Sequence, residues 1–304
     1  LWDSGKIESH SMCTTYAGTP LHSRIRVLWQ VRLWDESDVP GDWSEPAVFE
    51  LGLLYADDWR AQWITGDYTP DPKQRYPVDC FKKTFAAGEI KKARLYATAC
   101  GVYQAAINGQ TVEGFTLAPG ITDYRKRVQY QTYDVTALLQ DGENALTVQL
   151  ADGWYRGSCG AWGLKNQYGT ETKLLAQLEL TRADGSVQTV ATDESWDWSN
   201  DGPIRFADNK DGEIVDARKE PTYCGKAKVT SHPVTPSASN NVPVTEHERL
   251  KAKLITTPSG KTVLDFGQNI AGYAEFTVTA HAGQQINGQP KQGIQSNQGN
   301  VGAG

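Results

Sequence analysis

The stretch between residues 93 and 157 decides the fold. It reads ARLYATA at 93–99, GVYQAAI at 101–107, YQTYDVT at 130–136, NALTVQL at 144–150 and DGWYRG at 152–157. Apolar and polar side chains alternate in the first four segments, and the turn dipeptide Asn108-Gly109 follows the second. Alternation with a period of two residues, interrupted by Asn-Gly, is typical of antiparallel strands. The stretch therefore predicts an antiparallel β-sandwich.

The rest of the chain continues this pattern, and we expect no helix of any length. With 304 residues the chain has room for about two domains, or three if the modules are short. The predicted fold class is therefore all-β, with β-sandwich modules arranged in tandem.

The first module, residues 1–54, is expected to be a partial sandwich. Residues 24–35 alternate throughout and predict one long strand. The apolar residues that share one face of this strand are Ile25, Val27, Trp29, Val31 and Leu33. A complete seven-strand sandwich needs roughly 90–100 residues. We therefore interpret Leu1 as a position inside a domain, whose other strands precede it or come from another segment.

The second module is expected over residues 55–225, which hold enough strand segments for a jelly roll. Residues 226–243 are rich in Ser, Pro and Asn and are interpreted as a linker. Residues 244–304 are expected to begin a third β-domain. Apolar residues nearly vanish after about residue 283, so we expect this tail to be poorly ordered.

Bulk composition argues against two classes of partner. The formal net charge of -6 and the pI of about 5.5 disfavour nucleic acid, which requires a basic face. No apolar run is long enough to cross a membrane, so no membrane partner is expected. The first residues do not resemble a signal peptide. Because Leu1 is not a natural start, the compartment stays open.

The cysteines match neither a disulfide framework nor a zinc site. They are scattered along the chain at Cys13, Cys80, Cys100, Cys159 and Cys224. We expect reduced and mostly buried thiols. Free cysteines slightly favour the bacterial cytoplasm and leave an extracellular location open.

Ten short motifs, in the same order over residues 1 to about 280, make this chain resemble the N-terminal half of the large bacterial α-L-rhamnosidases. They are WDSGKIES at 2–9, WQVRLWD at 29–35, WSEPAVFELGLL at 43–54, AQWI at 61–64, GVYQAAING at 101–109, LAPGITDY at 117–124, YDVT at 133–136, DGWYRG at 152–157, GEIVDAR at 212–218 and DFGQNIAG at 265–272. Each motif alone is weak, and their shared order is the signal.

The resemblance implies three β-modules: a partial fibronectin-III-like sandwich, a galactose-binding-like jelly roll and the start of a concanavalin-like β-domain. In that family, acidic residues of a following helical toroid domain hydrolyse rhamnose-containing glycosides with inversion, using one general acid and one general base. The resemblance implies that this helical domain is absent from the chain and acts as its partner in the parent enzyme. We therefore expect these residues alone to hydrolyse nothing, and we assign no catalytic residue.

Three acidic residues are candidates for a catalytic pair: Asp152 and Glu213, which adjoin glycines, and Asp216. A general acid needs a raised pKa in a cleft that faces a second carboxylate, and strand spacing cannot establish this. We favour structural roles. Asp152 is expected to accept hydrogen bonds from backbone N–H groups of its Gly-rich loop. Asp216 or Glu213 is expected to pair with Arg218 or Arg156.

No cofactor is expected. Some related jelly rolls are implied to bind rhamnose through calcium, which requires six to eight oxygen ligands. The loop at residues 100–102 supplies no acid or amide, and Asp152 is a single carboxylate on the other loop. Calcium binding is therefore possible but not supported by these residues, and we assign no metal ligand.

The best candidates for carbohydrate binding are Trp154, Tyr155 and Trp162, with Asp152 beside them in a Gly-rich loop. Glycines allow the backbone to approach a ligand or a neighbouring domain closely. One interpretation is a platform for a sugar, because aromatic rings offer apolar contact to it. The other, which we favour, is a hydrophobic plug between domains.

Three functions therefore stay open. The chain is the non-catalytic accessory half of an inverting α-L-rhamnosidase, a stand-alone protein that recognises rhamnose-containing glycans, or a scaffold without a ligand. The domains that we expect to be unfinished at Leu1 and at Gly304 favour the first function. The scarcity of oxygen ligands near Asp152 argues against the second function.

Overall fold

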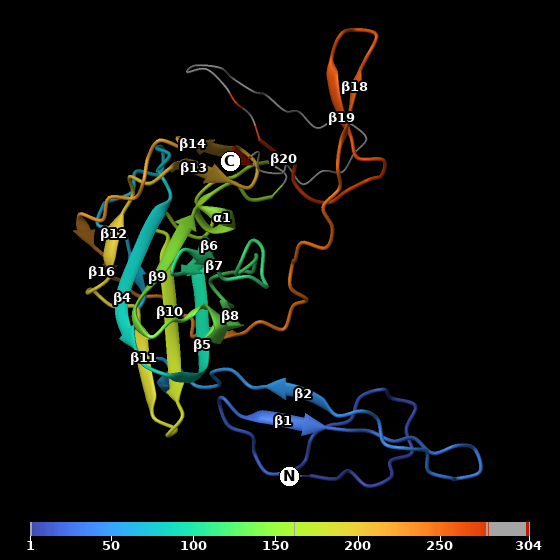
Figure 1. Ribbon diagram of the computed structural model, residues 1–304. Helices are drawn as coiled ribbons and strands as arrows, with labels where there is room; N and C mark the ends of the chain where they lie inside the picture. Colours follow the sequence, from blue (N-terminus) through green and yellow to red (C-terminus); the bar gives the residue numbers. More distant parts are fainter. Residues whose placement is uncertain (1, 161, 278, 280–301, 304) are drawn as a thin grey trace. The chain divides into compact units, whose positions relative to one another are not determined.

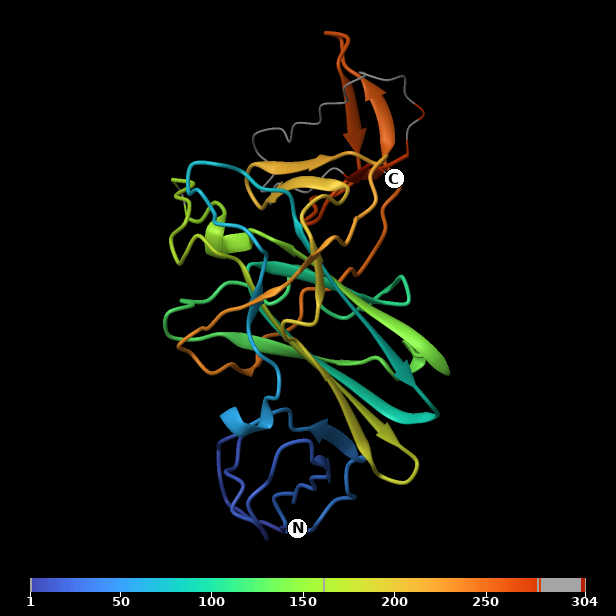
Figure 2. The same ribbon diagram turned by 90° about the vertical axis from the view of Figure 1, so that its left-hand side faces the viewer.

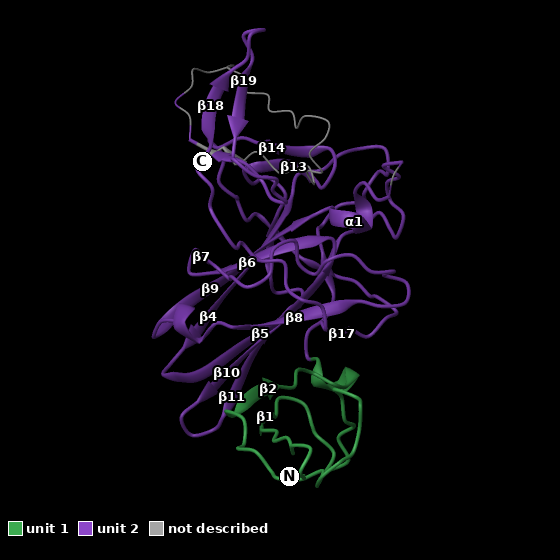
Figure 3. Cartoon of the chain, turned by 90° about the vertical axis from the view of Figure 1, so that its right-hand side faces the viewer, with its two compact units in different colours: residues 1–59 green, residues 60–304 purple. Residues whose placement is uncertain are grey.

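The computed structural model describes residues 2–160, 162–277, 279, 302 and 303. It divides into two compact units, residues 1–59 and residues 60–304 (Figure 3). Over the described residues the helical structure is limited to the single turn α1 (Gly153–Arg156) and the 3-10 turns η1 (Ala56–Asp58) and η2 (Thr136–Leu138). The predicted all-β class is confirmed.

Unit 1 contains one antiparallel strand pair, β1 (Arg26–Trp29) with β2 (Ala47–Glu50). The prediction of a single long strand over residues 24–35 is wrong. Val27 is buried, but Trp29, Val31 and Leu33 of the predicted core face are 47%, 50% and 79% exposed. The physical reason is that unit 1 has no second sheet within its described residues, so nothing covers this face.

Unit 1 also contains cation–π contacts of Arg32 and a set of hydrogen bonds to the Asp58 carboxylate. The Arg32 guanidinium lies 5.0 Å from the ring centre of Trp34 and 4.7 Å from that of Trp43. Asp58 accepts hydrogen bonds from Ser23 and Arg24 and from the backbone N–H groups of residues 54 and 55. These bonds join residues 23 and 24 to the end of the unit.

Unit 2 is built on two sheets of long strands (Figures 1 and 2). The first runs in the order β16 (Lys228–Val229), β3 (Ile64–Thr65), β10 (Lys173–Arg182), β5 (Ile90–Cys100), β8 (Gln129–Asp134) and β17 (Ser237–Ala238), with β11 (Val187–Ala191) paired to β10. The second runs in the order β15 (Gly225–Lys226), β12 (Asp197–Ser199), β4 (Asp79–Ala87), β9 (Gly142–Ala151), β6 (Val102–Ile107) and β7 (Gln110–Thr111). All pairings within these sheets are antiparallel except that of β17 with β8.

The core of unit 2 lies where side chains of both sheets meet. Leu95 of β5 and Leu178 of β10 belong to the same buried cluster as Phe81 of β4 and Val148 of β9. In β9 burial alternates from residue 144 to 150, as the NALTVQL segment predicts. Period-two patterning therefore places the inner faces of the sandwich correctly.

The Asn108-Gly109 turn is confirmed. Ile107 pairs with Gln110, and both turn residues have positive φ, 52° at Asn108 and 78° at Gly109. Two left-handed residues define the type I′ turn that matches the twist of a hairpin, and Asn-Gly is the favoured sequence.

The segment predicted as a linker, residues 226–243, contributes strands to unit 2. Its β16 pairs with β3 at one edge of the first sheet, and its β17 pairs with β8 at the opposite edge. The segment therefore crosses the sheet and covers both edges. The module boundaries themselves stay predictions.

Three further short pairs lie in the described part of unit 2. They are β13 (Ile204–Asp208) with β14 (Gly212–Val215), β18 (Lys253–Thr256) with β19 (Thr262–Asp265), and β20 (Glu275–Phe276) with β21 (Gly302–Ala303). The tail predicted to be poorly ordered after about residue 283 lies outside the described residues, apart from 302 and 303.

All five cysteines are free. Cys80 and Cys100 are buried, Cys159 is half-buried, and Cys13 and Cys224 are exposed. The expectation of mostly buried thiols therefore holds for two of the five. The exposed pair belongs to irregular segments rather than to core strands.

Candidate functional site

The DGWYRG motif forms the helical turn α1 at the end of β9, and an ion pair closes it. Arg156 Nη2 lies 2.7 Å from Asp152 Oδ1, and Arg156 Nε donates to the same oxygen at 2.8 Å. Both side chains are largely buried. We expected the Asp152 carboxylate to accept hydrogen bonds from backbone N–H groups. This prediction is wrong, because the carboxylate binds the guanidinium of Arg156, four residues later.

The turn depends on glycine at two positions. Gly153 has a φ of +54°, and a Cβ there would lie 2.7 Å from the backbone N of Val102. At Gly157 a Cβ would lie 2.4 Å from the carbonyl oxygen of Gly153 and 2.6 Å from Asp208 Oδ2. The glycines of this motif therefore serve close backbone packing.

Arg156 is linked through a tyrosine to a second buried carboxylate. Its Nη1 donates to the Tyr68 hydroxyl at 2.6 Å, and that hydroxyl donates to Asp79 Oδ2 at 3.3 Å. Asp79 also accepts hydrogen bonds from Trp198 Nε1 at 3.0 Å and from Thr172 Oγ1 at 2.9 Å. Asp79 is fully buried. We call Asp79, Tyr68, Arg156 and Asp152 the buried polar chain.

Burial and neighbouring charges shift the pKa values of the buried polar chain in opposite directions. Burial raises the pKa of Asp79, although the Arg156 guanidinium and three donors act against it. Burial also raises the pKa of Asp152, with Arg156 opposing. Burial alone lowers the pKa of Arg156, but Asp152, Tyr68 and Asp79 raise it overall, so the guanidinium keeps its charge. Removing one partner from such a sealed arrangement would leave a buried charge unpaired, and the arrangement offers no surface to a substrate.

Tyr155 lies inside a cluster of three tyrosines. Its ring centre is 5.2 Å from that of Tyr124 at 86°, and 6.4 Å from that of Tyr168. Tyr155 is 6% exposed, so it packs as a core residue. The Tyr124 hydroxyl donates to the carbonyl oxygen of Gly120 at 2.8 Å, which ties this cluster to the LAPGITDY motif.

The two tryptophans of the Gly-rich loop occupy different environments. Trp162 is 88% exposed. Trp154 is half-buried and lines a hollow of about 240 Å³. The structure therefore separates the four predicted carbohydrate-binding residues. Asp152 and Tyr155 point into packed interior, whereas Trp154 and Trp162 reach solvent.

The Pro119 hollow, as we call this cavity, lies between the LAPGITDY loop and the segment predicted as a linker. Residues 115–121 form one wall and Ser239 with residues 241–244 the other, and Gln131 and Trp154 also line the hollow. The sequence singled out the loop and Trp154 but gave no signal for Gln131 or Asn241, which lie in a strand and in an apparent linker.

The other two candidate acids are Asp216 and Glu213. Asp216 pairs with Arg218 through two hydrogen bonds of 2.8 Å, as expected. The Arg218 contacts hold the pKa of Asp216 down at about 2. Glu213 lies on β14, and burial raises its pKa.

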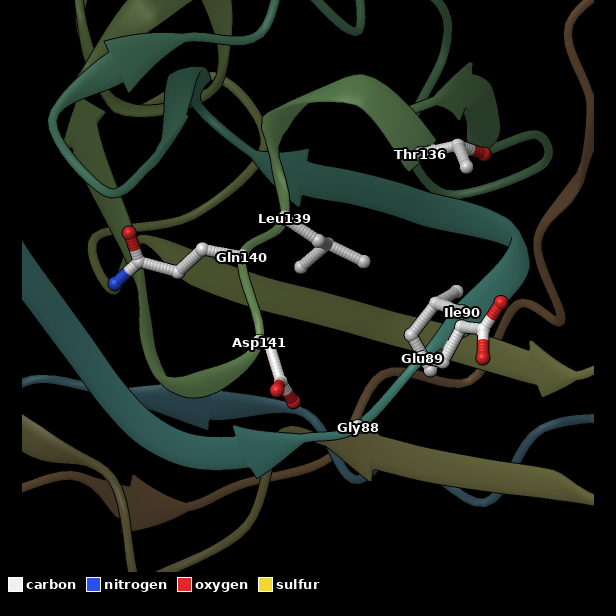
Figure 4. Close-up of a pocket in the computed structure, with 7 residues that line it drawn as sticks. All are labelled: Gly88, Glu89, Ile90, Thr136, Leu139, Gln140 and Asp141. Carbon is white, nitrogen blue, oxygen red and sulfur yellow. The ribbon is translucent and has the colours of Figure 1, made fainter.

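A second cavity contains two carboxylates, Glu89 and Asp141. It has a volume of about 370 Å³ and is formed by residues 88–90, Thr136 and residues 139–141. Both acids are exposed, and their carboxylates do not point toward one another (Figure 4). An inverting pair must flank one glycosidic bond, with the acid in surroundings that raise its pKa. Because their carboxylates point in different directions, Glu89 and Asp141 do not flank a shared position (Figure 4).

The donor set near α1 does not fit calcium. Asp152 Oδ1 is engaged by Arg156, and one carboxylate falls short of the several oxygens that calcium binds. Within the described ranges, no three His, Cys, Asp or Glu side chains gather closely enough to hold a metal ion.

Sequence reasoning missed the centre of the buried polar chain. Asp79 stands at the first position of β4, and Tyr68 lies in a Pro- and Asp-rich loop. Neither position carries a local pattern that predicts burial, because their contacts come from residues about 90 to 120 positions away.

Comparison with known families assigns each part of the chain. Residues 88–257 match the family model described as the α-L-rhamnosidase N-terminal domain. Residues 1–55 match the Rha78A-like N-terminal immunoglobulin domain, where the resemblance implied a fibronectin-III-like module. Residues 255–301 match the bacterial α-L-rhamnosidase concanavalin-like domain.

Individual relatives agree with these matches. The chain is 38% identical over 274 residues to an α-L-rhamnosidase of Formosa agariphila, covering 87% of this chain and 29% of that protein. The α-L-rhamnosidase structure from Aspergillus terreus aligns with a TM-score of 0.75 at 36% identity, covering 83% of this chain and 31% of that one. A Streptomyces avermitilis α-L-rhamnosidase complexed with L-rhamnose aligns with a TM-score of 0.76 at 26% identity, covering 88% and 44%.

The chain thus spans less than a third of the length of its Formosa agariphila relative. None of the helices in the part of the chain that the structure describes is long and apolar enough to cross a membrane. The matched domains follow one another in the order that the sequence motifs indicate. The identity to the Formosa agariphila protein supports the same family. This chain belongs to the α-L-rhamnosidase family.

Proposed function

We propose that this chain is the non-catalytic β-portion of an enzyme that hydrolyses terminal α-L-rhamnosyl residues from rhamnose-containing glycosides. The observation that carries the proposal is the match of its consecutive parts to N-terminal and concanavalin-like domains of α-L-rhamnosidases, over about a third of their length. The catalytic helical domain of the parent enzyme would be its partner. The stand-alone carbohydrate-binding protein is not favoured by this match.

The placement of the acids supports the lack of activity in the chain alone. Asp152 and Asp216 are bound to arginines, and Asp79 is sealed in the interior. Glu89 and Asp141 are exposed and point in different directions (Figure 4). Hydrolysis with inversion requires two carboxyl groups roughly 6.5–9.5 Å apart on opposite sides of the sugar.

The experiment incubates the purified 304-residue chain, at high concentration, with an aryl α-L-rhamnoside. We expect release of the aryl alcohol at the rate of the buffer control, while a full-length α-L-rhamnosidase such as the Formosa agariphila protein turns the substrate over. Turnover that stays with the chain through a second chromatographic step, and so is not a host contaminant, would overturn the proposal.

A further inference from the structure

The Pro119 hollow combines three properties that select a class of ligand. The first is the absence of charge. Charged residues make up 22% of the chain, yet none of the residues that line the hollow, all of them in the described part, is Asp, Glu, Lys, Arg or His. A carboxylate, phosphate or ammonium ligand would lose its hydration without gaining an ion pair, so the hollow favours a neutral molecule.

The second property is a mixed lining. Phe115, Trp154 and Ile121 supply aromatic and aliphatic surface, and Val242 stands 91% exposed on the other wall. Asn241 adds an amide: its Nδ2 donates to Gln129 Oε1 at 2.9 Å, which leaves its Oδ1 as an acceptor. A pyranose ring has an apolar C–H face and a rim of hydroxyl groups, so it matches such a lining.

The third property is rigidity of the loop wall. The carbonyl oxygens of Ala118, Pro119 and Gly120 accept hydrogen bonds from Tyr103 N at 2.9 Å, Gln131 Nε2 at 3.2 Å and the Tyr124 hydroxyl at 2.8 Å. Tyr124 in turn packs edge-on against Tyr155, the neighbour of Trp154. The loop and the residue next to Trp154 are therefore held by the same tyrosine cluster.

The opposite wall is also fixed. The backbone N of Thr116 donates to the carbonyl oxygen of Val244 at 2.7 Å, and Gln129 Nε2 donates to Asn240 Oδ1 at 2.9 Å. The parallel pairing of β17 with β8 lies directly before this segment. A site formed before ligand arrives loses little conformational entropy on binding.

We propose that the Pro119 hollow is a binding subsite for one neutral pyranose ring, independent of any metal ion. Drug-sized ligands occupy pockets of roughly 300–1,000 Å³. At about 240 Å³ the hollow accommodates a single ring rather than an oligosaccharide. The preference for the rhamnosyl unit, a 6-deoxy sugar whose methyl group suits an apolar wall, rests on the proposed function. The subsite itself rests on the geometry of the hollow.

The test is binding of methyl α-L-rhamnopyranoside to the full chain by saturation-transfer difference NMR, with titration for affinity. We expect the strongest transfer at the methyl and ring C–H protons. Trp154→Ala should weaken binding roughly tenfold. The matched control is Trp162→Ala, which removes an exposed tryptophan of the same loop outside the hollow and should leave binding unchanged. Excess EDTA should have no effect.

A second variant guards against misfolding of the first. Asn241→Ala removes only the amide and should weaken binding with an unchanged near-UV circular dichroism spectrum. Binding that is abolished by EDTA, that survives both Trp154→Ala and Asn241→Ala, or that is equal for D-glucuronate, overturns the subsite. Absence of binding to every pyranose tested overturns it as well.

A panel of neutral sugars separates this inference from the proposed function. If D-glucose or L-fucose binds in a Trp154-dependent manner and the rhamnoside does not, the subsite stands and its link to rhamnose fails. If the rhamnoside binds while a full-length relative of the same domain order fails to hydrolyse it, the subsite again stands and the proposed function loses its support.

Discussion

Arg156 and Asp152 stand one helical turn apart, with Arg156 Nη2 2.7 Å from Asp152 Oδ1 in a largely buried pair. The same guanidinium reaches the Tyr68 hydroxyl, which contacts Asp79 at the first position of β4. One arginine thus joins the end of β9 to a neighbouring strand and to an irregular loop. The buried ion pair between Arg156 and Asp152 therefore holds the motif that carries Trp154.

We predict that Arg156→Met destabilises the chain by about 3–5 kcal/mol, because it leaves buried carboxylates without their cation. Urea unfolding followed by far-UV circular dichroism measures the loss. The control is Arg218→Met, which breaks the exposed Asp216–Arg218 pair and should leave the unfolding midpoint unchanged. Equal effects of the two substitutions would contradict a structural role for the buried pair.

We predict that Asp79→Asn changes how stability depends on pH. Burial raises the folded-state pKa of Asp79 above its ordinary value of 3.8, so the folded chain binds more protons between the two values. The free energy of unfolding of the parent chain should therefore fall, relative to the variant, as pH rises through that window. Urea unfolding from pH 3.5 to pH 8 at intervals of about half a unit measures the difference.

Asp123→Asn provides a control of opposite sign. The Arg125 hydrogen bond lowers the pKa of Asp123 below 3.8, so the parent chain should gain stability over this variant as pH rises toward 3.8, and the urea series for this pair begins at about pH 2. A difference between parent and Asp79→Asn that is independent of pH would show that burial does not hold the proton on Asp79.

We predict that Gly153→Ala costs about 3 kcal/mol or more, because φ is +54° and the new Cβ meets the backbone N of Val102 at 2.7 Å. Gly109→Ala is the matched control: φ is +78°, but no atom lies within 4 Å. It should cost only the left-handed conformation, about 1–2 kcal/mol. Thermal unfolding of both variants ranks them, and the reverse order would refute the close approach at Gly153.

We predict that unit 1 opens more readily than unit 2. Two-stranded sheets are marginal in water, and β1 and β2 leave Leu28, Trp29, Val48 and Phe49 exposed. Hydrogen exchange measured by mass spectrometry on the intact chain should show β1–β2 amides at least roughly a hundredfold less protected than those of β5 and β10. Equal protection would mean that additional contacts cover the β1–β2 pair.

The sequence predicted unit 2 better than unit 1, for a physical reason. The period-two pattern of residues 93–150 coincides with strands that pair on both sides, so alternation translates into burial. Residues 24–35 carry the same pattern, but only residues 26–29 form a strand that pairs with another strand, and Trp34 adds an isolated antiparallel bridge to Pro40. Alternation states which side chains would share a face. It does not state whether a second layer lies over that face.

The candidate site shows a similar division. The DGWYRG motif marked the turn and its glycines, but local sequence could not decide that Tyr155 faces the core while Trp154 lines a hollow. Consecutive residues in a helical turn point about 100° apart, so their fates depend on what packs around the turn. The second wall of the hollow could not be predicted from the sequence, because a segment rich in Ser, Pro and Asn has the composition of a linker even when it pairs with a sheet.

That segment has a consequence for biosynthesis. The sheet keeps an unpaired margin at β3 and another at β8 until residues 228–229 and 237–238 arrive. Unpaired margins are templates for pairing between chains. A ribosome must therefore deliver the chain past residue 238 before the nascent sandwich is protected from neighbouring nascent chains, and a pause upstream of that point would lengthen its exposure to aggregation.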